Sequence, residues 1–554
     1  MPKITIDGFD IEFEDGQTIM QAANSVDYEI PSMCYKEGHA AQNSCMMCVV
    51  KINGNGRLIP SCSRPCEDGM VIESNCIEVN DMRKTTLDLM LSDHVGDCVA
   101  PCAHVCPAHM EIPQMLRQVM EGENLQALIT VKRDIPFPGI LGRICPEICE
   151  GGCRRGTYDT FESICLVKRY VADEDLAKDE PWIPEIPEKL GKSIAIIGSG
   201  PTGMSCAYYL LELGYDVTIY DANEKAGGNL RYAIPEEELP RSVLDKELNT
   251  LVRMGAAFKM GVRIGDDIGL DDLQRDFDAI FIAAGKLPDE EIQKIGVNAK
   301  RGKPVINKKT METNVKGVFA GGGMIIQNDL AIWALASGKD ASMSIDQYLS
   351  GKEIIGRTIR FNSKIGKISK EETTNLLEAQ VNTKDRYEPD ANQGTKFSKS
   401  DFKGFTDKEA KDESARCLHC DCRAKDNCDL RDFSEMFDAK QKRFTGKRRP
   451  IAILKESDRV HLDAGKCIQC GLCVQIAEDG GEEIGLAYEN RGFNTAIVAP
   501  LGFNINDALT ITAIEAAKAC PTGALSILNE EHTTDNPIDL FNEQFLKKPA
   551  ALES

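Results

Sequence analysis

The cysteines of this chain are its most restrictive feature, because they stand in short, regularly spaced groups. The 554-residue sequence has 22 cysteines and shows no signal peptide, so we expect a cytoplasmic protein whose thiols stay reduced. Grouped thiols in such a protein indicate metal or iron–sulfur ligation more than disulfide bonds. The fold must therefore bring several sets of sulfur atoms together.

Bulk composition excludes several classes of protein. The length predicts three or more domains, and a hydrophobic content of 42% is enough for their cores. No apolar run approaches the roughly 20 residues that a membrane span requires, so no membrane partner is expected. The net charge of −22 argues against nucleic acid and favours an acidic, soluble surface.

The segment 193–235 has the pattern of a dinucleotide-binding unit. The apolar run Ile194–Ile197 predicts a buried parallel strand, and a glycine-rich turn separates it from a helical pattern at Met204–Leu213. A second β-rich run, Asp216–Tyr220, is followed by Asp221. This order of strand, turn, helix, strand and acid favours a dinucleotide site.

The residues of the turn have separate roles in such a site. Gly198 makes the tight turn, Gly200 lets the backbone approach a pyrophosphate, and Gly203 lets the helix and strand pack closely. The helix N-terminus offers N–H groups to the phosphates. Asp221 is placed to accept a hydrogen bond from a ribose hydroxyl. The predicted contacts are Gly198, Gly200, Pro201, Gly203 and Asp221.

Residues 1–80 predict a small β domain with four cysteine ligands. The β-like runs are Ile4–Ile6, Ile11–Phe13, Cys48–Ile52 and Met70–Ile72. Four thiolates from one long loop and a strand can enclose a [2Fe–2S] cluster, and they are Cys34, Cys45, Cys48 and Cys62. Zinc is the alternative, although the first and last spacings are unlike a zinc knuckle. Cys66 and Cys76 lie outside the pattern and are interpreted as small buried hydrophobic residues.

This spacing resembles the [2Fe–2S] domain of the large iron–sulfur subunit of respiratory complex I and of related hydrogenase subunits. The resemblance implies a β-grasp ferredoxin fold. An amphipathic helix over Asp81–Asp97 then leads to His94-x3-Cys98. Complex I-type subunits carry a His-x3-Cys here whose histidine ligates a [4Fe–4S] cluster. A surface histidine is the alternative for His94.

Residues 81–190 predict a helical domain with two further cysteine runs. Cys98-x3-Cys102-x3-Cys106-Pro107 and Cys145-x3-Cys149-x3-Cys153 resemble the glutamate synthase small-subunit family, in which two [4Fe–4S] clusters share ligands between the two runs. The resemblance implies one cluster on His94, Cys98, Cys102 and Cys153. It implies another on Cys106, Cys145 and Cys149, with Cys165 as a candidate fourth ligand and core packing as the equal alternative for Cys165.

The segment after Asp221 resembles the flavin side of the same family. The matching stretches are Gly227–Pro235 (GGNLRYAIP), Pro235–Leu248, Asp278–Gly285, Gly317–Gly321 and Ala331–Gly338. The resemblance implies FAD bound by residues 191–350, with further contacts from Gly227, Gly228, Leu230, Arg231 and Gly322. The family usually has an aspartate near Gly322 or Gly323, whereas this chain reads GGGM.

The nicotinamide domain of that family is not expected in this chain. Gly285 and Gly317 are separated by about thirty residues, which hold barely one βαβ unit. No second G-x-G-x-x-G follows downstream. We therefore predict an FAD-binding domain without an NADPH domain.

A polar, lysine-rich linker is predicted over 351–410, followed by a four-cysteine segment over 411–446. A helix at Asp407–Arg416 leads into Cys417, Cys420, Cys422 and Cys428. Four cysteines so close together can hold a [4Fe–4S] cluster, and zinc is the alternative.

Residues 447–554 predict a ferredoxin-like domain with one cluster. Cys467, Cys470, Cys473 and Cys520-Pro521 resemble the two ends of a bacterial two-cluster ferredoxin, which implies that Cys520 completes the ligand set of the other three. The second cluster's ligand positions fall at Ala477, Thr510, Ala513 and Ala516. We infer that this second cluster was lost as a unit.

Together these features predict an α/β multidomain electron-transfer subunit with one [2Fe–2S] cluster, about four [4Fe–4S] clusters and FAD. No catalytic residue set is evident. The resemblances imply a soluble, anaerobic complex that links NAD(P)H to a hydrogenase, formate dehydrogenase or aldehyde oxidoreductase and includes electron bifurcation. NADH-oxidising flavoprotein subunits, thioredoxin-like [2Fe–2S] subunits and ferredoxin are the expected partners. The alternatives are a self-contained NAD(P)H oxidoreductase and a scaffold with a vestigial flavin site.

Overall fold

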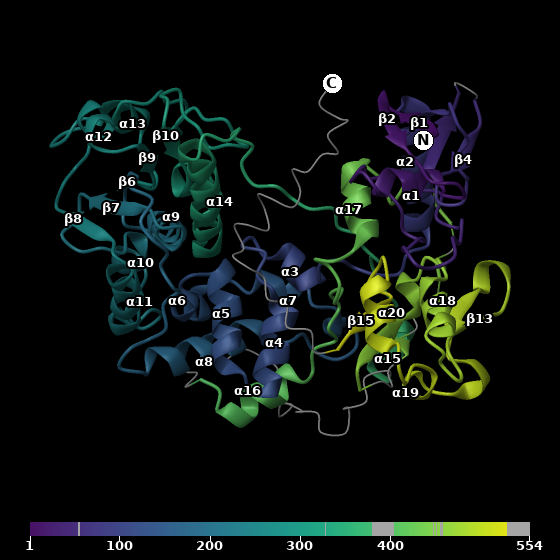
Figure 1. Ribbon diagram of the computed structural model, residues 1–554. Coiled ribbons are helices and arrows are strands. Elements are labelled where there is room, and N and C mark those ends of the chain that lie inside the picture. The colour runs from purple at the N-terminus through teal and green to yellow at the C-terminus, as the bar shows by residue number, and fades with distance from the viewer. Residues whose placement is uncertain are drawn as a thin grey trace. The chain divides into compact units, whose positions relative to one another are not determined.

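The protein divides into two compact units, which we describe separately (Figure 1). A computed structural model describes residues 1–53, 56–326, 328–378, 404–446, 448–449, 451, 453–454 and 458–528. The first unit combines residues 1–100, 360–383 and 420–554, and the second combines residues 101–359 and 384–419. Part of the predicted linker 351–410 and the end of the predicted domain 447–554 lie outside the described residues.

The N-terminal domain of the first unit is built on a five-stranded sheet in the order β2-β1-β5-β3-β4. The strands are β1 (Lys3–Ile6), β2 (Phe9–Glu12), β3 (Val49–Ile52), β4 (Leu58–Pro60) and β5 (Val71–Glu73). Alternating residues of β1, Ile4 and Ile6, are fully buried against helix α1 (Ile19–Asn24). The predicted ferredoxin-like fold is confirmed, and β4 is a strand that the sequence pattern did not reveal.

The rest of the first unit surrounds two cysteine groups. Helix α2 (Ile77–Ser92) ends just before His94, and α17 (Asp429–Met436) begins just after Cys428. The C-terminal ferredoxin-like part contains β11 (Ile453–Leu454), β12 (Val460–Asp463), α18 (Leu472–Asp479), β13 (Ala487–Glu489), β14 (Ala496–Val498), α19 (Ile505–Ala508), α20 (Ala513–Ala519) and β15 (Leu525–Ile527). Helix α15 (Lys370–Glu378) belongs to the same unit.

The second unit begins with a helical region that holds two cysteine runs. Its helices are α3 (Pro101–Val105), α4 (Ile112–Glu121), α5 (Asn124–Asp134), α6 (Pro138–Ile144), α7 (Ile148–Gly151) and α8 (Ile164–Leu176), joined later by α16 (Asp407–Ser414). Most of these helices are short, and several end at a cysteine or a glycine. The cysteines therefore lie mainly at helix ends and in turns.

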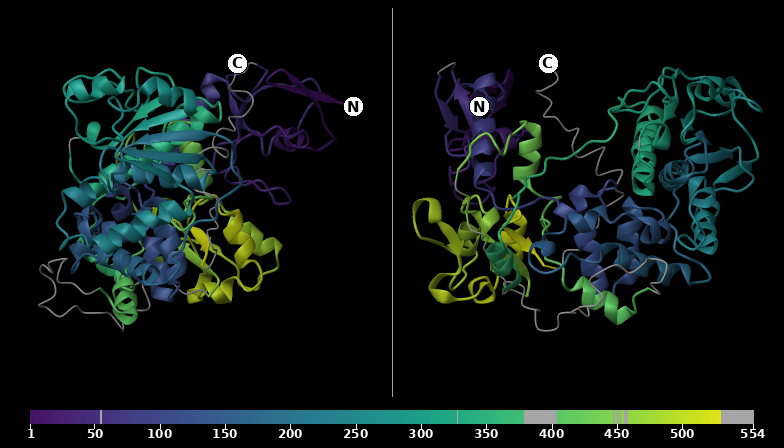
Figure 2. Two further views of the ribbon diagram at one scale, coloured as in Figure 1. Left: turned by 90° about the vertical axis from the view of Figure 1, so that its left-hand side faces the viewer. Right: turned by 180° about the vertical axis from the view of Figure 1, so that it is seen from behind.

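A parallel sheet forms the other half of the second unit (Figure 2). The strand order in this sheet is β10-β9-β6-β7-β8. The strands are β6 (Ser193–Ile197), β7 (Asp216–Asp221), β8 (Ala257–Met260), β9 (Ala279–Ile282) and β10 (Val318–Ala320). Helices α9 (Pro201–Glu212) and α14 (Ala331–Leu349) pack against each other and α11 (Arg241–Arg253) lies nearby. Shorter helices are α10 (Asn229–Tyr232), α12 (Leu270–Asp276) and α13 (Asp289–Ile295). The predicted strand–turn–helix–strand segment is confirmed.

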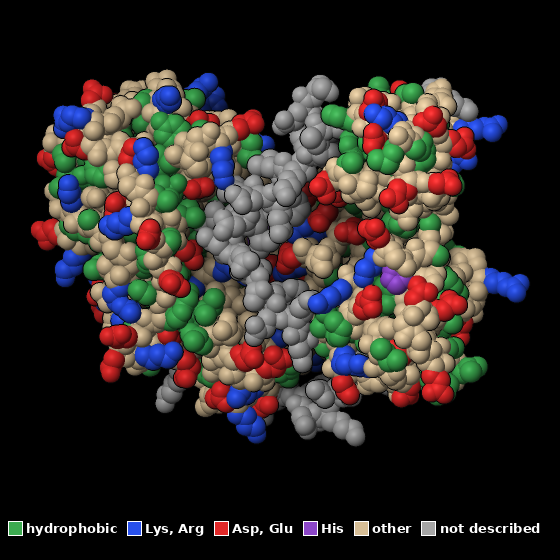
Figure 3. Space-filling model, in the orientation of Figure 1, with side chains coloured by type: hydrophobic (Ala, Val, Ile, Leu, Met, Phe, Trp, Pro, Cys, Tyr) green, Lys and Arg blue, Asp and Glu red, His purple; other side chains and the backbone are tan. Residues whose placement is uncertain are grey.

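The surfaces of both units carry mixed charge. Figure 3 shows acidic and basic side chains interspersed over the visible face of each unit. Among the described residues, none of the helices combines the length and apolar character needed to cross a bilayer.

Candidate iron–sulfur and flavin sites

The four cysteines of the N-terminal domain lie as two pairs. The Cys45 N–H donates to the Cys34 sulfur at 3.4 Å, and the Cys48 and Cys62 sulfurs are 3.4 Å apart. Hydrogen bonding within each pair lowers the pKa of one thiol, that of Cys34 to about 5 and that of Cys48 to about 7, and raises the pKa of its partner, Cys45 or Cys62, above the usual range. Two pairs of sulfurs fit a [2Fe–2S] rhombus, in which each iron takes two thiolates.

A buried arginine fixes the loop of this site. Arg83, on α2, donates from Nε to the Met47 carbonyl at 2.8 Å and from Nη2 to the Val49 carbonyl at 3.3 Å. Burial lowers the pKa of Arg83 to about 10, which still leaves it charged at neutral pH. The guanidinium therefore holds the loop that carries Cys45 and Cys48.

The C-terminal cysteines also come together. The Gln469 N–H donates to the Cys467 sulfur at 3.3 Å, and the Leu525 N–H donates to the Cys520 sulfur at 3.4 Å. Burial and the charge of Cys520 raise the pKa of Cys467 to about 11 and that of Cys470 to about 12. The four predicted ligands share one neighbourhood, and their role stays a prediction.

The place of the inferred lost cluster is filled by protein atoms. Ala477, Ala513 and Ala516 are buried in one hydrophobic cluster. The Glu482 carboxylate accepts hydrogen bonds from the N–H and hydroxyl groups of Thr510 and Thr512 and from the Ile511 N–H, at 2.6–2.9 Å. Burial raises the pKa of Glu482, but these donors lower it to about 2. A single carboxylate thus organises the loop before α20.

A cavity in the second unit is lined by three of the predicted cysteine ligands. It is lined by Cys106, Cys145 and Cys149 together with the Lys168 side chain. The Cys165 thiol hydrogen-bonds with Cys145 and Cys149, so all four predicted sulfurs meet there. Their arrangement fits a [4Fe–4S] cluster, for which four cysteine thiolates are the common ligand set.

Lys168 places a positive charge in this cavity. Its Nζ lies 3.7 Å from the Cys165 sulfur. Burial by itself lowers the pKa of Lys168, but the neighbouring thiols raise it above the usual range. Lys168 was missed in the sequence, although its place three residues after Cys165 puts both on one helix face.

The remaining ligand candidates fall on both sides of the division between the two units, and their assignment to clusters stays a prediction. His94 and Cys98 line a cavity of the first unit with Cys422 and Cys428. Cys102 and Cys153 belong to the second unit, as does Cys417, whereas Cys420 belongs to the first. Neither the predicted set around His94 nor the predicted set 417–428 lies within a single unit.

Polar groups surround this cavity of the first unit. The Cys98 and Ser363 side chains are 3.4 Å apart, and the Cys422 N–H donates to the Cys98 carbonyl at 3.2 Å. Burial, followed by the charges of Lys466 and Arg449, lowers the pKa of His94 to about 3. The imidazole is therefore neutral at pH 7.

Three cysteine groups of the first unit share one hydrophobic cluster. That cluster contains Cys34 and Cys45 of the N-terminal site, Cys470 of the C-terminal site and Cys428 of the His94 cavity. The Cys428 sulfur also lies 3.8 Å from the carbonyl of Pro521, the residue after Cys520. These groups are therefore neighbours in the fold.

The glycine-rich turn before α9 leaves open space beside Gly200. Gly198 has φ +110°, and a Cβ there would lie 2.4 Å from the Ala283 carbonyl oxygen. At Gly200 the nearest atom to a Cβ would be the Gly228 Cα, at 3.9 Å. The backbone at Gly200 thus faces open space beside the helix N-terminus, where Pro201 is the first residue.

Asp221 already has protein donors in this structure. Its Oδ2 accepts from the Ser199 N–H at 2.7 Å and hydroxyl at 2.6 Å, and its Oδ1 accepts from the Asn223 N–H and side chain, both at 2.8 Å. These four bonds occupy the lone pairs of the carboxylate. Asp221 therefore fixes the turn, and its contact with a ribose stays a prediction.

The other predicted flavin residues have structural partners. Gly227 and Gly228 have positive φ, and a Cβ on Gly228 would lie 2.7 Å from the Gly200 Cα. Leu230 is buried, and Arg231 donates from Nε to the Ala226 carbonyl at 2.6 Å. Gly228 therefore lies close against the turn at Gly200.

The local packing limits where an aspartate could replace a glycine in the GGGM segment. A Cβ on Gly322, which has φ +69°, would lie 2.1 Å from the Thr202 hydroxyl. At Gly323 the nearest atom would be the Gly285 Cα at 3.6 Å. An aspartate therefore fits at 323 but not at 322.

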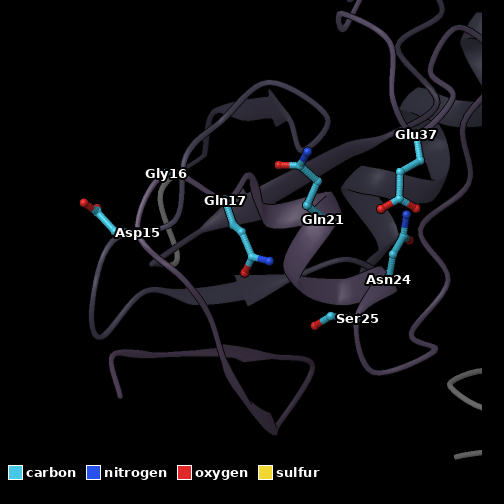
Figure 4. Close-up of a pocket in the computed structure, with 7 residues that line it drawn as sticks. All are labelled: Asp15, Gly16, Gln17, Gln21, Asn24, Ser25 and Glu37. Carbon is cyan, nitrogen blue, oxygen red and sulfur yellow. The ribbon is translucent and has the colours of Figure 1, made fainter.

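A separate polar hollow lies beside α1 and contains none of the predicted ligands. Figure 4 shows the residues around it, which are Asp15, Gly16, Gln17, Gln21, Asn24, Ser25 and Glu37. In the part of the chain that the structure describes, no three His, Cys, Asp or Glu side chains converge on the position of a single metal ion.

The known protein families that match this chain follow the order of the domains predicted from the sequence. Residues 2–76 match the 2Fe-2S iron-sulfur cluster binding domain, and residues 78–180 match domain II of dihydropyrimidine dehydrogenase, with 4Fe-4S cluster. Residues 162–340 match the pyridine nucleotide-disulphide oxidoreductase family, and residues 460–527 match a 4Fe-4S single cluster domain. The chain is a fusion of iron–sulfur domains with an oxidoreductase domain.

The relatives are oxidoreductase subunits. NADP(+)-dependent formate dehydrogenase subunit beta of Moorella thermoacetica is 37% identical over 34% of this chain and 29% of its own length. NADPH-Fe(3+) oxidoreductase subunit beta of Geobacter sulfurreducens is 38% identical over 34% of this chain and 28% of its own length. The glutamate synthase [NADPH] small chain of Escherichia coli is 33% identical over 35% of this chain and 42% of its own length. The matched regions thus span less than half of each relative.

Proposed function

We propose that this chain is the electron-transfer subunit of a soluble oxidoreductase complex, with iron–sulfur clusters and FAD as its redox groups. The observation that carries the proposal is the shared hydrophobic cluster of the first unit, which joins Cys34, Cys428 and Cys470 from three cysteine groups. Clusters held by these groups would be close enough to exchange single electrons through buried protein. The protein would tune each potential by burial and hydrogen bonding.

The individual sites support this role. The paired sulfurs of Cys34, Cys45, Cys48 and Cys62 suit a [2Fe–2S] cluster, and two further sets suit [4Fe–4S] clusters. These sets are Cys106, Cys145, Cys149 and Cys165, and Cys467, Cys470, Cys473 and Cys520. FAD would use the open space at Gly200.

The partners are inferred from the relatives. Names such as formate dehydrogenase subunit beta favour a terminal oxidoreductase subunit in the same complex. We propose an NADH-oxidising flavoprotein and a thioredoxin-like [2Fe–2S] subunit as electron donors, with ferredoxin and electron bifurcation as further features. Operation in an anaerobic cytoplasm is a further part of this proposal.

The test is the redox behaviour of the isolated chain. Protein purified anaerobically should contain about 18 irons and no stoichiometric zinc, because one [2Fe–2S] cluster and the four [4Fe–4S] clusters predicted from the sequence hold about two and sixteen irons. Dithionite or reduced ferredoxin should bleach its clusters, whereas NADH and NADPH should not. Addition of the partner flavoprotein should then allow NADH to reduce a viologen. Fewer than about 12 irons together with stoichiometric zinc would contradict the proposal.

A second candidate is a self-contained NAD(P)H oxidoreductase. It is favoured by the match of residues 162–340 to the pyridine nucleotide-disulphide oxidoreductase family. Hydride transfer requires the nicotinamide within roughly 3–3.5 Å of the flavin ring. Among the described residues of the second unit, every strand belongs to one sheet. Rapid bleaching of the isolated chain by NADPH would favour this candidate over the first.

A further inference from the structure

The loop 35–44, which lies between two of the predicted N-terminal ligands, contacts the C-terminal ferredoxin-like part through a chain of hydrogen bonds. His39 Nδ1 lies 2.6 Å from Asp479 Oδ2, and Gln475 Nε2 donates to Asp479 Oδ1 at 2.9 Å. Gln42 Nε2 donates in turn to Gln475 Oε1 at 3.1 Å. Both segments belong to the first unit, so the chain of bonds joins two cysteine-bearing regions of one compact body.

The direction of these hydrogen bonds follows from Asp479. An ionised carboxylate only accepts hydrogen bonds, so the Gln475 amide must donate to it and turns its carbonyl oxygen towards Gln42. Gln475 and Asp479 are four residues apart on α18, which places both side chains on one face of the helix. His39 therefore meets a carboxylate whose other oxygen is already bonded and whose position is fixed.

The setting of Asp479 favours a positive charge on His39. Asp479 is the last residue of α18, where the helix dipole is negative, and α18 contains no Lys or Arg. The hydrogen bond from His39, followed by that from Gln475, lowers the pKa of Asp479. The His39 side chain is 13% exposed and that of Asp479 is 41% exposed, so solvent and salt screen the pair only in part.

The other charged groups at this contact do not change their charge near neutral pH. They are Lys36 and Glu37 in the loop 35–44, Glu478 on α18, and Glu515 and Lys518 on α20. Lys36 pairs with Glu515 at 3.5 Å, which is a second contact between the loop and the C-terminal part. Lysine and glutamate side chains ordinarily keep their charge between about pH 5 and 8, whereas histidine changes its charge in that range.

We propose that His39 and Asp479 form a pH-responsive latch, which holds the loop 35–44 on α18 when His39 is protonated and loosens when His39 is neutral. A hydrogen bond from a charged donor to a carboxylate is about twice as strong as one between neutral groups. Because α18 also carries Cys473, the latch sets how closely the N-terminal and C-terminal cysteine sites are held together. His39 and Asp479 act as positioning residues.

The inference rests on the proposed electron-transfer function and deepens it by naming a regulation of that function. A loop held firmly on α18 keeps the two cysteine sites at a short, constant separation. Single electrons would therefore pass between these sites faster at the acidic end of the histidine range than at its basic end.

Hydrogen exchange measures the latch directly. The full chain, purified anaerobically with its clusters, is exchanged at about pH 6 and about pH 8, and the rates are corrected for the intrinsic pH dependence of amide exchange. In the wild type, the amides of the loop 35–44 should be on the order of fivefold more protected at the lower pH. His39→Gln and Asp479→Asn should lose this difference. His39→Lys, which carries a permanent charge, should stay protected at both pH values.

EPR of the reduced protein tests the link between the two cysteine sites. The [2Fe–2S] signal should be broadened more strongly by its C-terminal neighbour at the lower pH, and this dependence should vanish in His39→Gln. Lys36→Met removes the neighbouring ion pair with Glu515, whose charges are constant over this range, and should keep the pH dependence. His104→Gln, in the other unit, should keep it as well.

The outcomes separate the latch from the proposed function. Wild-type protein that contains its clusters but shows equal loop protection at both pH values would overturn the latch. A pH dependence that survives in His39→Gln would overturn it too. Either result would leave the proposed function intact, whereas anaerobically purified protein without clusters would contradict the proposed function and this inference together.

Discussion

Ser44 donates a hydrogen bond from its hydroxyl to the backbone carbonyl of Cys470, at 3.3 Å. This bond joins the loop of the N-terminal cysteines to the loop of the C-terminal cysteines. Gln42 donates to the Gln475 side chain at 3.1 Å beside it. Two sites that are more than 400 residues apart in the sequence are therefore held together by polar contacts.

Cys520→Ala tests the grouping of the C-terminal ligands. We expect loss of about four irons and of one [4Fe–4S] signal, because the other three ligands lie in the same neighbourhood. The [2Fe–2S] signal should persist, with less broadening from its neighbour. EPR and iron analysis of anaerobic protein measure this, and loss of a second [4Fe–4S] signal would contradict the grouping.

Gly523→Ala should disturb the cavity of Cys422. The new methyl group would lie 2.2 Å from the Cys422 sulfur, so the sulfur or the backbone must move. We expect a destabilisation of about 1–3 kcal/mol and a shifted cluster signal. Gly446→Ala is the control, because a Cβ there meets no atom within 4 Å. Equal unfolding temperatures and spectra for the two variants would disprove the close approach.

Lys168→Met should make the cluster at Cys106 harder to reduce. The buried ammonium lies 3.7 Å from the Cys165 sulfur and stabilises the extra negative charge of the reduced state. We expect the reduction potential of this cluster to become about 60 mV more negative, which is a tenfold change in the equilibrium constant of a one-electron reduction. Redox titration followed by EPR measures it, and the exposed Lys286→Met is the control.

Glu482→Gln should loosen the loop before α20. The amide lacks the charge that strengthens the bonds from Thr510 and Thr512, so we expect a loss of about 1 kcal/mol in a half-exposed setting. Thermal unfolding measures the loss. The adjacent, exposed Glu483→Gln should show no change.

The same carboxylate gives a pH dependence of known sign. The pKa of Glu482 is lowered to about 2 in the folded protein, whereas the ordinary pKa of a glutamate is about 4.3. The ionised carboxylate therefore stabilises the folded state in full when the pH is above about 4.3. The effect is lost as the pH falls from that range towards 2. The stability difference between wild type and Glu482→Gln should therefore be constant from pH 7 to 5 and shrink below it.

Gly200→Val tests the flavin site. Its side chain would fill the open space beside the start of α9, where a pyrophosphate must approach. We expect loss of bound FAD after gel filtration, with the cluster signals intact. Flavin released by acid denaturation measures it. Wild-type protein without flavin under gentle isolation would favour the scaffold with a vestigial flavin site.

The sequence by itself determined the local chemistry of this protein. The alternation of Ile4 and Ile6 set the first strand, and the glycines at 198, 200 and 203 set the turn before α9. Spacing within a run also predicted that Cys467, Cys470 and Cys473 share a neighbourhood, because residues three apart in a tight loop stay close.

Only the tertiary structure decided which runs meet. Cys98 and Cys102 are four residues apart yet belong to different units, whereas Cys98 and Cys422 are joined by a backbone hydrogen bond. Charges such as Lys168 and Arg83 also gained their role from burial, which depends on packing across the whole unit. Ligand spacing is a local property, but a cluster site requires long-range contacts that only the packed core specifies.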